Sequence, residues 1–355
     1  MIAFSWRQFR MQALIGGGGL VVLGVVLLVT GPNLVHVYDA ALAQCRAGGG
    51  IGSACNNPVI STDSRLQVLV LGLVLIVPVL IGMFWGAPLV ARELEAGTFR
   101  LAWTQSVSRL RWLLVKLGLV GLASAAVGGL LSLMATWWFS PIDKVNANRF
   151  GAAAFGTHGF VPAGYALFAF ALGATTGLLF RRTLPAMVVT LVGFIVARFV
   201  VAYSIRPRFM TPVTKAMALQ PNGGLDFNQS PAGFSVMTNP PDLRNALIVS
   251  NSVVNNAGQS PSTAFLQKAC PQATGATGPP GSGVQGVGRA RAAAVPDQQA
   301  FQQCITTISA KFHEVVTYQP ASRFWAFQTY ETLLFVAASA MLAGVCVWWM
   351  RRRLI

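Results

Sequence analysis

Residues 88–116 read PLVARELEAGTFRLAWTQSVSRLRWLLVK, a charged, helix-forming stretch that separates two long apolar runs. The run before it covers about 66–87, and the run after it covers about 113–139. Each is close to the roughly 20 residues that a helix needs to cross a hydrocarbon layer about 30 Å thick. The pattern therefore predicts two membrane-spanning helices joined by a polar connection.

The composition of the whole chain fits a membrane protein. Of its 355 residues, 54% are hydrophobic and 10% are charged, and the apolar residues come in blocks rather than at the periods of a soluble core. The net charge of +16 could indicate nucleic-acid binding, but the Arg and Lys residues lie largely at the ends of the apolar blocks. The charge therefore indicates membrane topology and a lipid bilayer as partner, and no nucleic acid.

The predicted fold class is an all-α integral membrane protein with six transmembrane helices. Residues 1–12 alternate aromatic and basic side chains, which is typical of a helix in the headgroup layer, and Gly31-Pro32-Asn33 is expected to end the first span. Spans 1 to 5 fall within 13–203, and residues 351–355 form a short tail. The predicted spans are about 13–30, 66–87, 113–139, 160–180, 184–203 and 327–350.

A large insertion, residues 204–326, separates spans 5 and 6 and is far longer than an ordinary connection. Pro, Gly and small residues dominate 271–296, which predicts a flexible linker without a core. A helix is expected on each side of this linker. One begins at a Ser262 cap and ends near Cys270, and the other begins at an Asp297 cap. The second helix is expected to place a set of apolar residues on one face: Phe301, Cys304, Ile305, Ile308, Phe312 and Val315.

The basic residues predict the orientation. With six spans, the basic flanks fall on one face, which the positive-inside rule makes the cytoplasm, so that both termini are cytoplasmic. These flanks are Arg7, Arg10, Arg92, Arg100, Arg109, Arg111, Lys116, Arg181, Arg182 and Arg351 to Arg353. The loop at 34–65 and the large insertion then lie outside the cell. An oxidising compartment favours disulfides, so we expect Cys45 to pair with Cys55 and Cys270 with Cys304.

Several motifs resemble the permease subunits of ABC-2 type transporters. Glu95-Ala96-Gly97-Thr98, the segment from Thr104 to Arg109, and Lys116 are similar to the E-x-G-T, T/P-x-S-R and Lys elements that are common in that family. Further stretches look like an actinobacterial branch of these permeases: WRQFR at 6–10, RPRFMTP at 206–212 and YQPASRFWAFQTYET at 318–332. The resemblance covers nearly the whole chain except the linker at 271–296.

The resemblance implies an efflux permease in a bacterial cell membrane, driven by a separate ABC ATPase subunit present in two copies. A second copy of this chain, forming a homodimer, or a similar permease would complete the assembly. The sequence contains no G-x-x-x-x-G-K-[ST] motif, so we expect no enzyme activity and no cofactor in this chain, with ATP and Mg²⁺ on the partner.

Residues 88–116 would contain the coupling helix that docks on the ATPase. Gly97-Thr98 would break one short helix and cap the next, while Glu93 and Glu95 face the partner. The alternative is a solvated charged loop, but apolar side chains such as Leu94 and Leu101 need a surface to cover them. The expected coupling residues are Glu93, Glu95, Gly97, Thr98, Phe99, Trp103, Arg109 and Lys116.

By the same resemblance, spans 2 and 5 would line the transport path. They offer mainly Leu, Val, Met and Phe, which favours an amphipathic or hydrophobic cargo such as a drug, a peptide antibiotic or a lipid. The expected path residues are Leu75, Pro78, Gly82, Met187, Leu191, Phe194 and Arg198. Arg198 lies well inside a span, where it either snorkels to the interface or meets cargo at the outer end of the path.

Two other classes of function stay open. An ion-coupled secondary transporter would need a buried carboxylate, and Glu331 lies near the outer end of span 6 rather than at its middle. A membrane sensor or resistance module would bind a peptide or an antibiotic at the outer insertion. The histidines His36, His158 and His313 are scattered, which does not favour a metal site.

Overall fold

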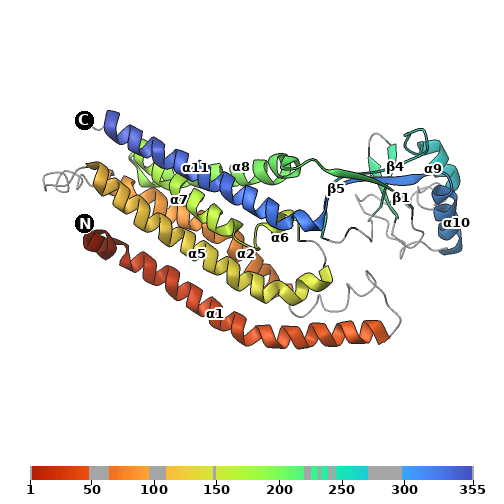
Figure 1. Ribbon diagram of the computed structural model, residues 1–355, viewed down its shortest axis with the longest axis horizontal. Coiled ribbons are helices and arrows are strands. Elements are labelled where there is room, and N and C mark those ends of the chain that lie inside the picture. The colour runs from red at the N-terminus through yellow and green to blue at the C-terminus, as the bar shows by residue number, and fades with distance from the viewer. Residues whose placement is uncertain are drawn as a thin grey trace, which may run out of the picture. The chain divides into compact units, whose positions relative to one another are not determined.

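The computed structural model describes residues 2–47, 64–95, 109–146, 149–219, 225–230, 233–238, 243, 245–270 and 298–353. The chain divides into two compact units (Figure 1). One unit comprises Met1–Phe209 with Ser322–Ile355, and the other comprises Met210–Ala321.

Within these described residues, six helical segments are long and apolar enough to cross a membrane, which confirms the predicted number. They are Arg10–Val37, Leu66–Glu95, Leu110–Ser140, Val161–Phe180, Thr183–Arg208 and Ala321–Arg352. The chain is therefore a multi-pass membrane protein.

In the residues that the structure describes, all regular structure of the first unit is helical. Its elements are α1 (Ile2–Ala47), α2 (Ser64–Ile81), the π-helix η2 (Gly82–Gly86), α3 (Ala87–Glu95), α5 (Arg109–Asn146), α6 (Ala152–Phe155), α7 (Val161–Phe180), α8 (Thr183–Val200), the π-helix η3 (Val201–Ile205), the 3₁₀ helix η4 (Arg206–Arg208) and α11 (Phe324–Arg353). A 3₁₀ helix, η6 (Ala321–Arg323), precedes α11.

The expected end of the first span at Gly31-Pro32-Asn33 is wrong, because α1 continues through Pro32 to Ala47. Figure 1 shows it as one ribbon that bends near its middle, and a proline inside a helix is a usual cause of a kink. Just before Pro32, the Trp138 indole donates to Thr30 Oγ1 at 3.1 Å, and Leu27 is buried beside α2 and α5. A proline is tolerated inside a membrane-spanning helix because neighbouring groups compensate for the backbone hydrogen bond that it removes. Residues 2–12 form the first turns of the same helix, and their place in the headgroup layer stays a prediction.

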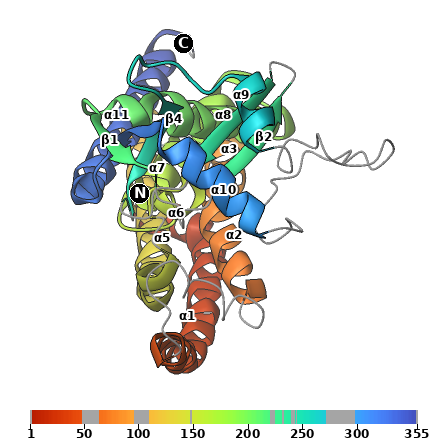
Figure 2. The same ribbon diagram turned by 90° about the vertical axis from the view of Figure 1, so that its right-hand side faces the viewer.

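Helix α7 is the centre of the first unit and is buried over most of its length. It contacts α2, η2, α3, α5, α8 and α11 (Figure 2). Glycines bring its backbone against η2 and α3: a Cβ added at Gly173 would lie 2.1 Å from the Gly82 carbonyl oxygen, and one at Gly177 would lie 2.3 Å from that of Ala87. Any side chain at these positions would push the helices apart.

The second unit contains strands that the sequence analysis did not predict, so the all-α fold class describes only the first unit. The strands β1 (Val213–Ala218), β5 (His313–Gln319) and β4 (Leu247–Val254) form an antiparallel sheet in the order β1-β5-β4. The strands β2 (Leu225–Ser230) and β3 (Gly233–Thr238) form an antiparallel pair. Strand β5 alternates partly and fully buried residues over much of its length, as expected of a strand with one covered face.

The two helices expected beside the linker are present as α9 (Thr263–Ala269) and α10 (Gln298–Ser309). Ser262 caps α9 as predicted, with its Oγ accepting from the Phe265 N–H at 3.3 Å. A disulfide joins Cys270 to Cys304, which confirms that pairing, and both cysteines lie in a core with Leu266. Val315, expected on the face of α10, instead belongs to β5, because the helix ends at Ser309. Asp297, the linker at 271–296 and Cys55 lie outside the described residues, as does the side chain of Cys45.

Candidate functional site

The stretch 88–116 leaves the bundle through α3 and returns through α5. Pro88 to Glu95 belong to α3, and Arg109 begins α5. The four predicted coupling residues between them lie outside the described residues: Gly97, Thr98, Phe99 and Trp103. The side chain of Arg109 is likewise not described. The geometry of this site therefore rests on Glu93, Glu95 and Lys116.

Lys116 and Glu93 form an ion pair that joins α5 to α3. The side chains are 4% and 18% exposed, respectively. The Lys116 ammonium also lies 4.5 Å from the centre of the Trp112 ring, one turn earlier on α5. A buried ammonium is costly unless a counter-charge accompanies it, so the pair fixes the two helices in one register. Glu93 is thus directed at its own chain, and its predicted contact with a partner stays a prediction.

Glu95 ties the end of α3 to the start of α8. The Thr183 hydroxyl donates to Glu95 Oε2 at 2.5 Å, and Glu95 is otherwise exposed. A cluster of buried residues joins the same end of the bundle, with Val90 of α3 packed against Trp112 of α5, Leu178 of α7 and Met350 of α11. The N-terminal end of α1 lies at this end too (Figure 1). This end of the bundle also carries exposed basic side chains: Arg92, Arg111, Arg181, Arg182, Arg351 and Arg352.

A second charged cluster, which the sequence analysis missed, is buried toward the opposite end of α7. Arg206 binds both oxygens of Glu331, with Nε 2.8 Å from Oε2 and Nη2 2.9 Å from Oε1. The Tyr165 hydroxyl donates to the same carboxylate, and the Arg206 guanidinium lies 4.1 Å from the centre of the Phe155 ring. Arg206 lies in the quoted motif 206–212 and Glu331 in the quoted motif 318–332. The opposite charges of these two residues were the signal in the sequence from which their pairing could have been predicted.

Arg198 extends this cluster with a second guanidinium. It lies 3.9 Å from the centre of the Tyr165 ring and is half-buried. A Cβ added at Gly156 would lie 2.7 Å from Arg198 Nη2, so the side chain crosses toward the Gly156 turn. The guanidinium therefore stacks on α7 within the bundle, which stabilises the cation against an aromatic face.

The other predicted path residues serve mainly as packing contacts in this chain. Gly82 lies against α7, since a Cβ there would be 2.6 Å from the Ala169 carbonyl oxygen. Phe194 is buried, with its ring centroid 6.5 Å from that of Tyr165 and 6.4 Å from that of Phe168. Pro78 is buried, and the remaining three are half-buried: Leu75, Met187 and Leu191. None of the seven predicted path residues, Arg198 included, lines the cavity described next.

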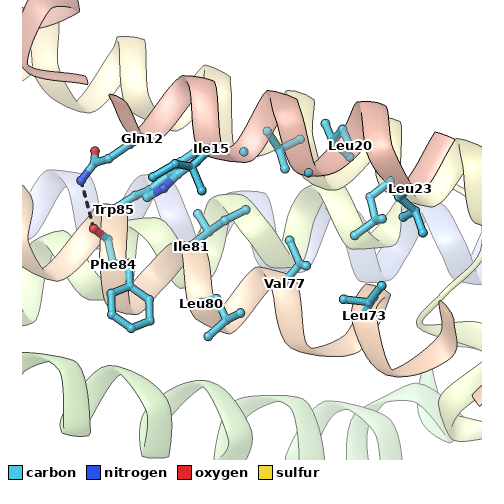
Figure 3. A pocket seen from close by; sticks show the side chains of 14 residues that line it. Gln12, Ile15, Leu20, Leu23, Leu73, Val77, Leu80, Ile81, Phe84 and Trp85 are labelled. Atoms are coloured by element: carbon cyan, nitrogen blue, oxygen red, sulfur yellow. Dashed lines mark hydrogen bonds between the residues drawn. The ribbon is translucent and has the colours of Figure 1, made fainter. Parts of the chain in front are cut away.

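A cavity of about 550 Å³ lies between α1 and the α2–η2 helix; we call it the α1–α2 slot (Figure 3). Its walls are Gln12, Ile15, Gly16, Gly19, Leu20 and Leu23 of α1, Leu73, Val77, Leu80, Ile81, Phe84 and Trp85 of α2 and η2, and Val127 and Leu131 of α5. Gln12 closes one end by donating from Nε2 to the Phe84 carbonyl at 3.2 Å.

Within the described residues, no group of three or more His, Cys, Asp or Glu side chains is placed to hold a metal ion. A family model described as ABC-2 membrane transporter related matches residues 17–206, which is more than half of the chain. Neither a curated protein nor a solved structure matches the chain.

Proposed function

Because the chain belongs to the ABC-2 membrane transporter related family, we propose that it is the membrane-spanning permease subunit of an ATP-driven exporter. The family implies a partnership with an ATPase subunit and with the membrane. In our proposal two ATPase subunits hydrolyse ATP with Mg²⁺, while this chain has no catalytic activity and binds no cofactor. It works as a homodimer or beside a similar permease, in a bacterial cell membrane with both termini in the cytoplasm.

The observation that carries the proposal is the way stretch 88–116 is anchored in the bundle. Its first part, α3, contacts α7 backbone to backbone at Gly177, and its last part, α5, is joined to α3 by the buried Lys116–Glu93 pair. The Glu95–Thr183 hydrogen bond adds α8 to the same unit. A displacement of 96–108 by a partner would therefore move α3, α7 and α8 together, because packed helices transmit shifts as rigid bodies.

The surface at this end of the bundle suits a protein partner. Glu95, Arg92 and Arg111 are exposed, and Leu94 is half-buried beside the core of the bundle. We propose that Gly97, Thr98, Phe99, Trp103 and Arg109 complete the contact, with Glu93 and Lys116 setting the position of α3. Complementary charges across such a contact determine orientation and selectivity.

The proposed cargo is amphipathic or hydrophobic, and the proposed direction is outward. The predicted path residues on α2 and α8 are apolar except Arg198, which makes a strongly charged cargo unfavourable along most of that route. In a dimer the exposed apolar face of α8, which includes Val188, Val192 and Phe199, would border the path or the lipid.

Coupling is tested by co-expressing the chain with a candidate ABC ATPase subunit and purifying the complex in lipid. Gly97→Val and Glu95→Lys should reach the membrane at normal levels but lose ATPase co-purification and stimulated ATP turnover, since insertion depends on the apolar spans. Lys215→Glu is the matched control, because it reverses an exposed charge on β1. If Gly97→Val and Glu95→Lys both bind the ATPase and turn over ATP as the wild type does, the coupling assignment fails.

One observation bears on an ion-coupled transporter as the second candidate: Glu331 is a buried carboxylate within a candidate span. Such groups are typical of proton or sodium pathways. Both of its oxygens bind Arg206, however, so the carboxylate is engaged in an ion pair within the chain. Transport that persists in the presence of a protonophore and a sodium ionophore, and stops without ATP, would exclude this alternative.

A further inference from the structure

We propose that the α1–α2 slot is a binding site for one acyl chain of a membrane phospholipid, with the lipid headgroup at the Gln12 end. The proposal rests on the membrane placement of α1, α2 and α5, and it holds whether or not the chain exports a cargo. Its support comes from the shape of the slot, the chemistry of its two ends and the solvent that surrounds it.

The slot is long and narrow. Its α1 wall, from Gln12 to Leu23, consists of residues spaced three and four apart, and so does its facing wall from Leu73 to Trp85. Each set therefore forms one stripe along its helix. At 1.5 Å per residue, these stripes extend about 16 to 18 Å. One leaflet is half of a hydrocarbon core about 30 Å thick, so the slot has the length of a single acyl chain.

The two ends of the slot differ in chemistry. At one end Gln12 supplies an amide, and the exposed Arg10 precedes it by two residues, where the apolar span Arg10–Val37 begins. The start of the span is the depth in the bilayer at which the phosphate and ester groups of a phospholipid contact the protein. At the other end the slot closes where Leu27 packs with Val70 and Val74 in a buried cluster. The polarity thus matches a lipid that enters with its tail toward Leu23.

The surroundings of the slot decide its occupant. Three large apolar lining residues are also part of the outer surface, with exposures of 73% for Ile15, 41% for Leu80 and 52% for Phe84, so the slot is open to the outside. At these positions the outside is the bilayer. An apolar cavity is a poor site for water, and an unfilled one loses dispersion contacts along its walls. A lipid tail is as apolar as the lining, so fit and headgroup contacts determine the affinity.

Two neighbouring glycines provide a matched pair of variants. Gly19 lines the slot, and a Cβ added there would meet no atom within 4 Å, so a larger side chain can enter the space without moving the backbone. Gly18 has equally free surroundings but does not line the slot. Gly19→Phe should therefore fill the slot, whereas Gly18→Phe adds the same ring at a neighbouring exposed position that does not line it.

The experiment uses the full chain in vesicles of phosphatidylethanolamine and phosphatidylglycerol, with a phospholipid that carries a photoreactive diazirine on one acyl chain. Lipid adducts are expected on peptides covering 12–23 and 73–85 in the wild type and in Gly18→Phe. In Gly19→Phe they should fall about tenfold, because the ring takes the space of several methylene groups. Thermal unfolding and gel filtration check that each variant is folded. If Gly19→Phe does not fold, Gly19→Leu and its control Gly18→Leu replace the two phenylalanine variants.

Equal adduct yield in Gly19→Phe and the wild type would overturn the proposal, as would an absence of adducts on these two stretches. A photoreactive benzoylphenylalanine at Leu80 separates lipid from a second copy of the chain as the occupant. An adduct with phospholipid supports the proposal. A cross-linked dimer that Gly19→Phe abolishes assigns the slot to a protein interface and overturns it.

Discussion

At the scale of single residues, the buried pair of Arg206 and Glu331 connects the end of the α8 segment to α11. Each partner lies in a candidate span, where neither charge is solvated by water. Tyr165 adds a hydrogen bond from α7, so three helical segments meet at one carboxylate. The stability of this contact depends on both charges being present.

Replacing one partner of the Arg206–Glu331 pair should destabilise the protein more than replacing both. Glu331→Gln leaves a buried guanidinium without its counter-charge, and such losses cost about 3 to 5 kcal/mol. The double variant Arg206→Met with Glu331→Leu should cost less, because no charge stays buried. Reversible unfolding in detergent, with Arg206→Met and Glu331→Leu as the two single variants, completes the double-mutant cycle. A Glu331→Gln protein as stable as the wild type would contradict this account.

At the scale of elements, the packing of α3 and η2 on α7 depends on the absence of side chains. Gly82 and Gly86 face Gly173 and Gly177. A Cβ added at any of these four glycines would lie within 2.6 Å of a backbone oxygen. Backbone atoms cannot swing aside as a flexible side chain does. The glycines of these helices therefore set how closely η2 and α3 approach α7 at the centre of the bundle.

Gly173→Ala should destabilise the protein by about 1 to 3 kcal/mol, as expected when a well-packed contact is overfilled. Gly118→Ala on α5 is the matched control, because a Cβ there meets no atom within 4 Å. That change should be neutral or slightly stabilising, since alanine is the better helix former. Thermal unfolding of the two variants in the same detergent compares them, and equal midpoints would show that α7 tolerates a wider separation.

At the scale of the whole molecule, the disulfide fastens the second unit across the linker. Cys270 and Cys304 are 34 residues apart in sequence, and both lie in the core that α9 and α10 share. In the chain-entropy model, closing a loop of this length stabilises the unit by about 4 kcal/mol. A disulfide of this kind also fits the oxidising side of a membrane.

The double variant Cys270→Ser with Cys304→Ser should lose up to about 4 kcal/mol of stability in the second unit and become more sensitive to limited proteolysis there. The single variant Cys346→Ser, which removes a buried free thiol of α11, is the control. Non-reducing mass mapping of the wild type checks the premise and also tests the predicted Cys45–Cys55 pair. Free thiols at 270 and 304 would refute the disulfide account.

Sequence alone determined the features that depend on local pattern. Six apolar runs of spanning length predict six spans whatever their packing, because the thickness of the bilayer limits every span separately. The helices beside the linker followed from the Ser262 cap and from apolar spacing, and the charged stretch 88–116 was visible as a break in hydropathy. In each case a window of about 20 residues holds all the information needed.

Only the tertiary structure decided the features that depend on contacts between distant residues. Strand β5 pairs with β1 about a hundred residues away in the chain, and Arg206 meets Glu331 across a separation of 125. Trp138 likewise meets Thr30 of α1 across a separation of 108, and the α1–α2 slot is lined by residues of α1, α2, η2 and α5 together. Local propensity is weak beside such packing, so these contacts, and the site they form, leave no pattern within a single segment of sequence.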